Sequence, residues 1–165
     1  MEEATTKARL AREALHPPRR YPGAMPEIFL GGACAERELD VARGDIRGLD
    51  ARHLVPDVGT LAEGRRGSAV WLAGLADLAG PTDEARFVHV ESDDGGFTAN
   101  IPLDQALRGG LVLYEHEGEE LPREYGGPFR LLFVDREDCS VSVKFLGKIE
   151  FVGEPGSHTA HCADD

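Results

Sequence analysis

The sequence lacks the features of several large classes of protein. No apolar run approaches the length of a membrane span, and residues 1–20 contain no apolar segment like the core of a signal peptide. Its three cysteines are an odd number at unrelated spacings, which argues against a disulfide framework. The chain has no P-loop and no G-x-G-x-x-G, G-x-S-x-G or C-x-x-C motif. We therefore expect a cytoplasmic protein without a membrane partner.

Basic residues are scarce relative to acidic ones. The net charge is −12, and because residues 1–20 carry +2, the remainder of the chain carries −14. An acidic body argues against nucleic-acid binding, which needs a basic face, and against anionic membrane surfaces. A small anionic ligand is still allowed, since a few local arginine or lysine side chains suffice to bind one. No protein partner follows from the composition.

The length and the turn residues predict a single domain with flanking segments. The chain has 165 residues, with 20 glycines and 10 prolines, which favours many turns and short elements over a helical bundle. We expect an N-terminal extension at 1–25, a domain at 26–152 and a flexible tail at 153–165. The extension combines a helix at 4–15 with a Pro-rich linker, and it is either a basic arm for a partner or a loosely tied terminus.

Strand-like and short helical patterns alternate irregularly along the domain, which does not suggest a doubly wound parallel sheet. Apolar periodicity and turn residues predict helices at 45–53, 72–79 and 102–107, the second ending at a Gly80 C-cap. Strands are expected at 27–30, 38–42, 69–72, 87–90, 98–101, 111–114, 129–134 and 143–152. We expect Trp71 to be at least partly buried beside a core of Leu72, Leu75, Phe87, Val88, Val90, Ile101, Leu103, Leu111, Leu113, Leu131, Phe133, Phe145, Ile149 and Phe151.

Five short motifs occur in a fixed order in the C-terminal half. They are Glu91-Ser92-Asp93-Asp94-Gly95 with the segment 101–107, then 111–115, the Pro/Gly-rich stretch 117–130, Ser142-Val143-Lys144-Phe145, and 148–151. In this order they resemble the molybdopterin-binding domain of the sulfite oxidase family, of which this chain looks like a short, divergent member. The resemblance implies a single mixed α+β domain with a largely β core and short helices.

The resemblance also implies a basic, small-residue loop that holds the phosphate of the molybdopterin. On this basis the candidate cofactor-binding residues are Arg65, Arg66, Ser140, Ser142 and Lys144. The two arginines can meet a phosphate bidentately, and the serines can donate hydrogen bonds. The other interpretation of these residues is surface solvation or ordinary salt bridges. Two departures weaken the pattern, because Val141 stands where the family often has a basic residue and Tyr125 where it often has histidine.

In the family, a cysteine thiolate binds molybdenum directly, because a soft anionic sulfur suits this metal. The corresponding segment here, 53–61, has no cysteine, and none occurs from Ala35 to Asp138. Cys34 falls in the family's first strand, which is not the element that carries the metal ligand. Asp57 offers a carboxylate, a harder metal ligand than a thiolate, but it is more simply interpreted as a turn residue after Pro56. Cys139, just before Lys144, is the candidate substitute metal ligand, or else a small buried side chain.

Three functions are compatible with these observations. The first is a non-catalytic binding or scaffold protein that lacks the molybdenum-ligating cysteine; it needs no cofactor, although molybdopterin can still dock. The second is a molybdenum-cofactor oxidoreductase with a substitute ligand, so whether the chain is an enzyme stays open. The third is a metal-binding module in which His158, His161 and Cys162 of the tail combine with Cys139. The missing cysteine favours the first.

Overall fold

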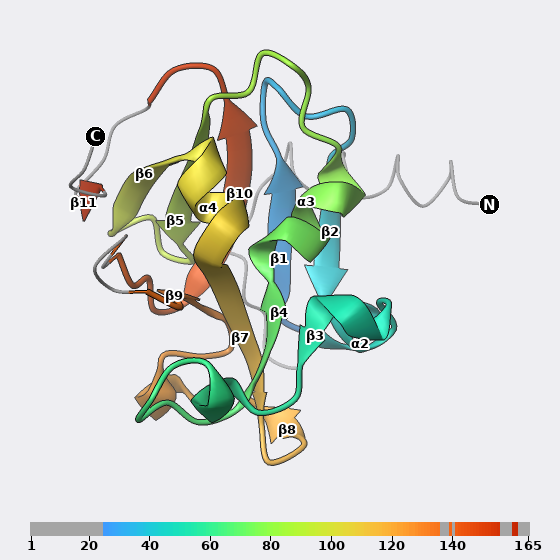
Figure 1. Ribbon diagram of the computed structural model, residues 1–165, viewed down its shortest axis with the longest axis vertical. Helices are drawn as coiled ribbons and strands as arrows, with labels where there is room; N and C mark the ends of the chain where they lie inside the picture. The colour runs from blue at the N-terminus through green and yellow to red at the C-terminus, as the bar shows by residue number, and fades with distance from the viewer. Residues whose placement is uncertain (1–24, 136–138, 140, 156–159, 162–165) are drawn as a thin grey trace.

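The structure, a computed structural model, describes residues 25–135, 139, 141–155 and 160–161. Within these residues a six-stranded sheet has the order β11 (Ala160–His161), β6 (Thr98–Pro102), β5 (Phe87–Ser92), β10 (Leu146–Val152), β1 (Glu27–Gly31) and β2 (Leu39–Ala42). The last long strand, β10, lies between β1, to which it is parallel, and β5, to which it is antiparallel (Figure 1). The two ends of the domain are therefore joined at the centre of one sheet.

A second sheet is built around one central strand, β7 (Gly110–His116). It runs from β3 (Leu54–Val55) through β4 (Ser68–Trp71) and β7 to β8 (Glu119–Glu120), and β9 (Arg130–Phe133) also pairs with β7. Strand β4 pairs with residues 111–115 of β7 along one edge. Strands β9 and β8 share the other edge, where β9 pairs with residues 110–113 and β8 with residues 115–116.

Short helices connect and cover the sheets. The α-helices of the described chain are α2 (Arg43–Arg47), α3 (Leu72–Ala79) and α4 (Leu103–Gly109), and 3₁₀ turns occupy η1 (Ala51–His53), η2 (Val58–Thr60) and η3 (Arg123–Tyr125). Helix α3 contacts β1 of one sheet and β4 and β7 of the other, and α4 contacts β5, β6 and β7 (Figure 1). The two helices thus pack both sheets into one α+β domain, which confirms the predicted fold class.

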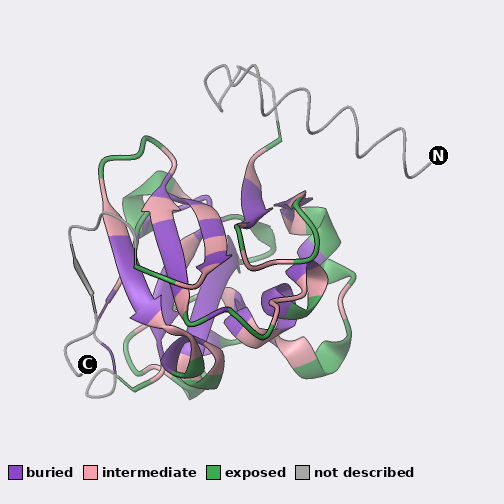
Figure 2. Cartoon of the chain, turned by 90° about the horizontal axis from the view of Figure 1, so that it is seen from above, coloured by how far each residue is buried: buried purple, intermediate pink, exposed green. Residues whose placement is uncertain are grey.

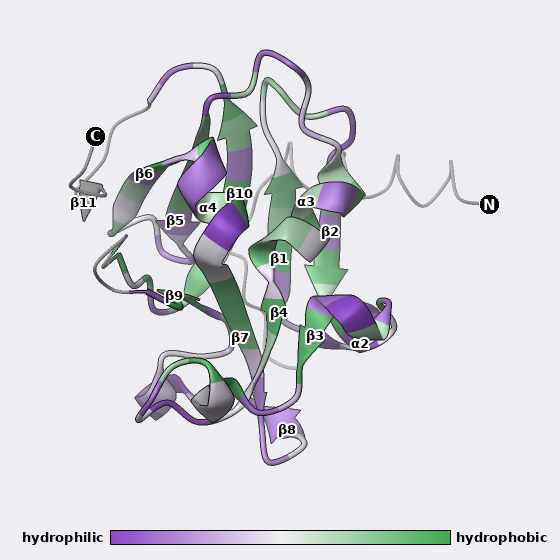
Figure 3. Ribbon diagram, viewed as in Figure 1, coloured by the Kyte–Doolittle hydropathy of each residue, from purple (hydrophilic) through white to green (hydrophobic). Residues whose placement is uncertain are grey.

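The side chains of β7 alternate between two hydrophobic clusters. Val112 and Tyr114 belong to the main core, which lies between the sheets and the helices and includes residues from all the long strands. Leu111 and Leu113 belong to a smaller outer core with Val58 on the other face of the second sheet. Successive residues of a strand point to opposite faces, so β7 is buried on both. In Figure 3 the hydrophobic part of β7 contrasts with the hydrophilic α2 and β8.

Most of the predicted core is buried, and the strands in Figure 2 are purple over most of their length, with pink bands where residues are half-buried. Trp71 is partly buried against the outer core, as predicted. Leu103 is only half-buried but packs against the main core. Phe87 and Phe145 are half-buried and belong to neither core, so their assignment to the core was wrong. Phe87 and Leu103 stand at the first positions of β5 and α4, where the elements meet the surface. Phe145 stands in a turn with a φ of 58°.

Most element boundaries differ from the predictions by one or two residues, and two predicted elements are interrupted. The strand expected at 143–152 begins only at Leu146, because Phe145 adopts a left-handed backbone conformation that interrupts it; Val143 instead forms an isolated bridge with Leu131. The helix expected at 45–53 is replaced by α2 and, after Gly48 and Asp50, the separate turn η1. The helix at 72–79 and its Gly80 C-cap, with a φ of 71°, are confirmed.

No helix within the described ranges has the length and apolar content needed to cross a bilayer.

The central position of β10 generates a stability prediction. Ile149 is 0% exposed and pairs with Leu30 of β1 and Val90 of β5. Ile149→Ala should therefore lower the free energy of unfolding by about 2–5 kcal/mol, measured by urea denaturation followed by circular dichroism. The control is Leu61→Ala, whose side chain is 37% exposed and whose loss should cost about 0.5 kcal/mol or less. Equal losses in the two variants would contradict this core.

Candidate functional site

A cavity of about 250 Å³ opens on the outer-core face of the second sheet. We call it the arginine pocket, because three arginines from two distant parts of the chain meet there. Arg65 and Arg66 come from the loop between η2 and β4, and Arg130 begins β9. The remaining lining residues are Gly64, Leu113, Glu124, Tyr125 and Leu132. The leucines form the apolar floor of the pocket, since both belong to the outer core.

Arg130 is held by hydrogen bonds that leave its charge unneutralised. Its Nε and Nη2 donate to the hydroxyl oxygen of Ser142 at 3.2 and 3.0 Å, and its Nη1 donates to the backbone carbonyl of Tyr125 at 3.3 Å. All of these acceptors are neutral. Partial burial, and secondarily the nearby charge of Arg65, lower the pKa of Arg130. The guanidinium is therefore positioned but has no ion-pair partner among the residues that the structure describes.

The other two arginines are also available to a ligand. Neither Arg65 nor Arg66 forms an ion pair with a residue of the described chain. The acidic side chain that lines the pocket is Glu124, which is exposed to solvent. Three guanidinium groups against one carboxylate give the pocket a local excess of positive charge on a protein whose net charge is −12. Such an arrangement attracts a small anion.

Gly126 brings a further basic residue next to the pocket. It adopts a φ of +92°, and a Cβ built on it would lie 2.8 Å from Cδ of Arg130 and 3.1 Å from Cγ of Lys144. The backbone N–H of Phe145 also donates to the carbonyl of Gly126 at 2.7 Å. Glycine is needed at this position both for its conformation and for the close approach of the two basic side chains.

The predicted site residues fall in three groups. Arg65 and Arg66 line the arginine pocket, while Ser142 and Lys144 contact its wall through Arg130 and Gly126. Ser140 lies outside the described residues. Sequence reasoning did not name Arg130 as a site residue, although it is the last residue of the motif 117–130, because only the pairing of β9 with β7 brings it to the pocket that Arg65 and Arg66 line. Whether these residues bind a cofactor stays a prediction.

The cysteine named as a metal ligand lies away from the pocket. Cys139 is buried in the main core, with 2% of its surface exposed, and its sulfur is part of a disulfide bond. Metal binding by Cys139 would require its reduced form. Cys34 is the free cysteine of the described chain and packs at the edge of the main core. Neither sulfur lines the arginine pocket.

The segment in which the family has its cysteine ends in an ordinary turn. Asp57 is exposed and caps η2, where its Oδ1 accepts the backbone N–H of Gly59 at 2.9 Å. This is the turn conformation predicted for it. The backbone N–H of Val58 donates to the carbonyl of Gly67, which closes the loop that carries Arg65 and Arg66. Asp57 therefore shapes the loop of the arginine pocket.

The metal site predicted in the tail concerns residues that the structure does not describe: His158 and Cys162 lie outside the described ranges, and only the backbone of His161, in β11, lies within them. Among the residues that are described, no three His, Cys, Asp or Glu side chains gather in a way that could hold a metal ion.

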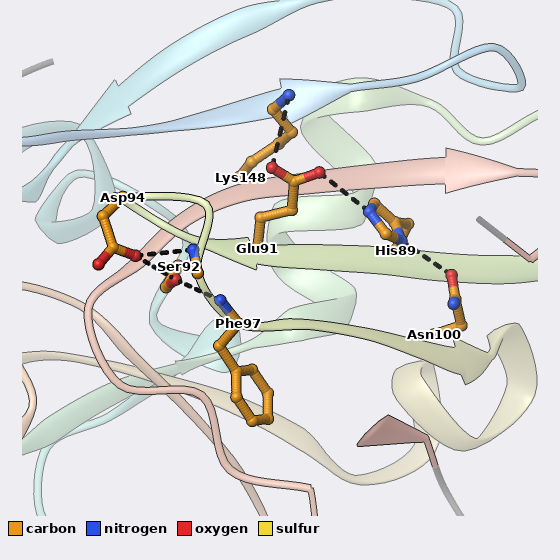
Figure 4. Close-up of polar contacts among 8 residues, drawn as sticks. His89, Glu91, Ser92, Asp94, Phe97, Asn100 and Lys148 are labelled. Atoms are coloured by element: carbon orange, nitrogen blue, oxygen red, sulfur yellow. Dashed lines mark hydrogen bonds and ion pairs between the residues drawn. The ribbon is translucent and has the colours of Figure 1, made fainter. Parts of the chain in front are cut away.

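A polar network on β5 and β6 has a structural role (Figure 4). His89, 8% exposed, contacts the side-chain oxygen of Asn100 through Nδ1 at 2.8 Å and Glu91 through Nε2 at 3.0 Å. Glu91 also lies 3.9 Å from Lys148 of β10. These contacts join three adjacent strands and satisfy a buried imidazole. His89 is thus a packed histidine of the sheet.

The loop between the same strands is fixed by Asp94. Its Oδ1 accepts the backbone N–H of Gly96 at 2.9 Å and the hydroxyl of Ser92 at 2.8 Å, and these bonds, the Gly96 bond first, lower the pKa of Asp94 (Figure 4). The Ser92 hydroxyl oxygen in turn accepts the N–H of Phe97. The Glu91–Gly95 motif therefore shapes a turn, and none of its side chains lines the arginine pocket.

The packing at Gly126 predicts a difference between two glycine variants. Gly126→Ala should cost more stability than Gly95→Ala, because both positions have positive φ but only the first has no room for a methyl group. The strained backbone alone should cost about 1–2 kcal/mol in each variant. Urea denaturation measures both losses. Equal losses would show that Gly126 does not hold Arg130 and Lys144 in close contact.

Comparison with known proteins identifies the family. The model of the oxidoreductase molybdopterin binding domain matches residues 62–160. A curated relative, the "Uncharacterized oxidoreductase YuiH" of Bacillus subtilis (strain 168), is 37% identical over 81 residues, which are 48% of this chain and 40% of that protein. The solved structure of the sulfane dehydrogenase SoxCD from Paracoccus pantotrophus matches with a TM-score of 0.58 at 16% identity, over 78% of this chain and 38% of the other.

These matches confirm the resemblance inferred from the motifs of the C-terminal half. The solved structure supports the fold alone, and the chain spans about two fifths of the length of each matched protein. The family match begins at residue 62, within the loop that carries Arg65 and Arg66, and continues through β10. Because the family model covers more than half of the residues, the chain belongs to the oxidoreductase molybdopterin-binding domain family.

Proposed function

We propose that this chain is a binding protein of its family that holds the phosphate of a molybdopterin in the arginine pocket and does not form a thiolate-ligated molybdenum centre. The observation that carries the proposal is the convergence of Arg65, Arg66 and Arg130 without ion-pair partners in the described chain. We place this activity in the cytoplasm, with a small anionic ligand as the partner.

The contacts of Arg130 support a phosphate as the bound group. A phosphate accepts paired hydrogen bonds from the planar fork of a guanidinium, and such charge-assisted bonds are stronger than the neutral bonds that Arg130 now makes to Ser142 and Tyr125. A doubly charged phosphate also offsets the repulsion between Arg130 and Arg65, which contributes to the lowered pKa of Arg130. Ser142 and Lys144 stand close enough to Arg130 to complete the anion's shell.

The same pocket fits the molybdenum of the cofactor less well than its phosphate. When bound, the complete cofactor supplies a metal that exchanges electrons with a substrate. In the family a soft thiolate helps to hold that metal, but the lining of the arginine pocket offers guanidinium, carboxylate, phenol and apolar groups. The sequence has no cysteine between residues 34 and 139, and Cys139 is buried in the main core. These observations favour binding over catalysis.

The proposal predicts that inorganic phosphate binds to the arginine pocket. In isothermal titration calorimetry at low salt, Arg65→Gln should weaken phosphate binding about tenfold, because it removes one charge-assisted contact. Arg130→Gln should weaken it at least as much. The matched control is Arg108→Gln, which removes the same charge from an exposed residue of α4 outside the pocket and should leave the affinity unchanged.

Two results would contradict the proposal. One is equal phosphate affinity of the wild-type protein and both pocket variants. The other is an equal loss of affinity in the Arg108→Gln control, which would show that phosphate responds to net charge and not to a site. The alternative function, an oxidoreductase with a substitute ligand for molybdenum, requires bound metal and substrate-dependent electron transfer as well as phosphate binding.

A further inference from the structure

A second cavity, of about 350 Å³, lies on the opposite face of β7. Leu113 lines the arginine pocket and the next residue, Tyr114, lines this second cavity, so the strand separates the two. We call it the tyrosine cavity. Its lining is Met25, Pro26, Arg43, Gly44, Arg47, Tyr114, Glu120, Pro128 and Phe129. It has the size of a small-molecule site and shares no lining residue with the arginine pocket.

The floor of the tyrosine cavity carries a polar group without a protein partner. Tyr114 is only 4% exposed, and its hydroxyl makes no hydrogen bond to any residue that the structure describes. The hydroxyl oxygen is not among the fully enclosed unpaired atoms of the described chain, so it is open to solvent, as the polar tip of a mostly buried tyrosine often is. Desolvation, and then the nearby charge of Glu115, raise the pKa of Tyr114, so the hydroxyl stays protonated and available as a donor at neutral pH.

The wall of the cavity carries two arginines that share one carboxylate. Nη1 of Arg43 and Nε of Arg47 lie 2.9 and 3.0 Å from the same Oε2 of Glu115, which is buried. Nη1 of Arg43 also donates to the carbonyl of Gly118. The two terminal nitrogens of Arg47 make no hydrogen bond or ion pair within the described chain. One negative charge thus faces two positive ones, and donors remain for a second anion.

The rest of the lining is mainly apolar. Pro26, Pro128 and Phe129 offer hydrophobic surface, and Met25, which is 68% exposed, stands at the mouth. Glu120 is exposed and adds a negative charge to the lining. This carboxylate disfavours a ligand with two negative charges, such as phosphate. The cavity is therefore suited to an amphipathic ligand with a single anionic end.

We propose that the tyrosine cavity binds a small organic carboxylate with an aromatic or branched aliphatic body. Its carboxylate accepts hydrogen bonds from Arg47, Arg43 and the hydroxyl of Tyr114. Its apolar body packs against Pro128 and Phe129. The three donors and the apolar walls belong to one cavity, so a single ligand can use both, and its carboxylate accepts the hydrogen bond that the Tyr114 hydroxyl does not make within the described chain. This site is independent of the phosphate site proposed above.

The test uses 3-phenylpropanoate as the probe, with isothermal titration calorimetry on the full chain. Saturable binding is expected, about tenfold tighter than that of the neutral 3-phenylpropan-1-ol, because only the anion uses the arginines. Arg47→Gln should reduce the affinity about tenfold. Tyr114→Phe keeps the shape of the ring, so its folding is preserved, and should reduce the affinity about threefold to tenfold through the lost hydrogen bond.

Arg65→Gln is the control, because it alters the arginine pocket and not the tyrosine cavity, and it should bind the probe like the wild-type protein. Three outcomes would overturn the proposal: no saturable binding of 3-phenylpropanoate to the wild-type protein, equal affinity for the alcohol, or affinities of Arg47→Gln and Tyr114→Phe equal to that of wild type. Because phosphate and 3-phenylpropanoate are titrated separately, failure at one site leaves the result at the other intact.

Discussion

The alternation of side chains along β7 is the constraint on which the rest of the structure depends. Val112 and Tyr114 pack into the main core, while Leu111 and Leu113 pack into the outer core, so one strand is buried on both faces. A shift of its register by one residue would exchange the two faces. The same alternation places one cavity on each side of the second sheet, with different lining chemistry. The fold therefore determines where ligands can approach.

Local charge decides what those cavities can bind, against the background of an acidic protein. The body of the chain repels anions over the Debye length of roughly 8–10 Å, but charges in direct contact within a partly buried site are screened much less. In the arginine pocket, three guanidinium groups face one exposed carboxylate. Partial burial destabilises the charged form of Arg130, so a bound anion would stabilise it. In the tyrosine cavity, Glu115 already neutralises one of two arginines, and the exposed Glu120 adds a further negative charge to the lining. The first site therefore favours a phosphate and the second a monoanion.

Local sequence patterns were sufficient for many of the elements and for two of the three arginines of the arginine pocket. The helix ending at Gly80 followed from apolar periodicity and a left-handed C-cap, and Arg65 and Arg66 stood out as a basic turn. The remainder depends on long-range contacts. Arg130 joins the pocket only because β9 pairs with β7, and the strand before Leu146 is interrupted by a conformation at Phe145 that no local pattern indicated. The tyrosine cavity likewise depends on the packing of α2 against β7 through Glu115, and the hydrophobic periodicity of the sequence does not specify this contact.

The central claim is that the chain binds a molybdopterin through its phosphate without a catalytic metal centre. The most direct test is to purify the protein from a host that makes the cofactor and to measure pterin by fluorescence and molybdenum by elemental analysis on the same sample. The account predicts bound pterin that decreases in the Arg65→Gln, Arg66→Gln double variant, with little or no molybdenum. Molybdenum at one atom per chain, together with substrate-dependent electron transfer, would contradict it.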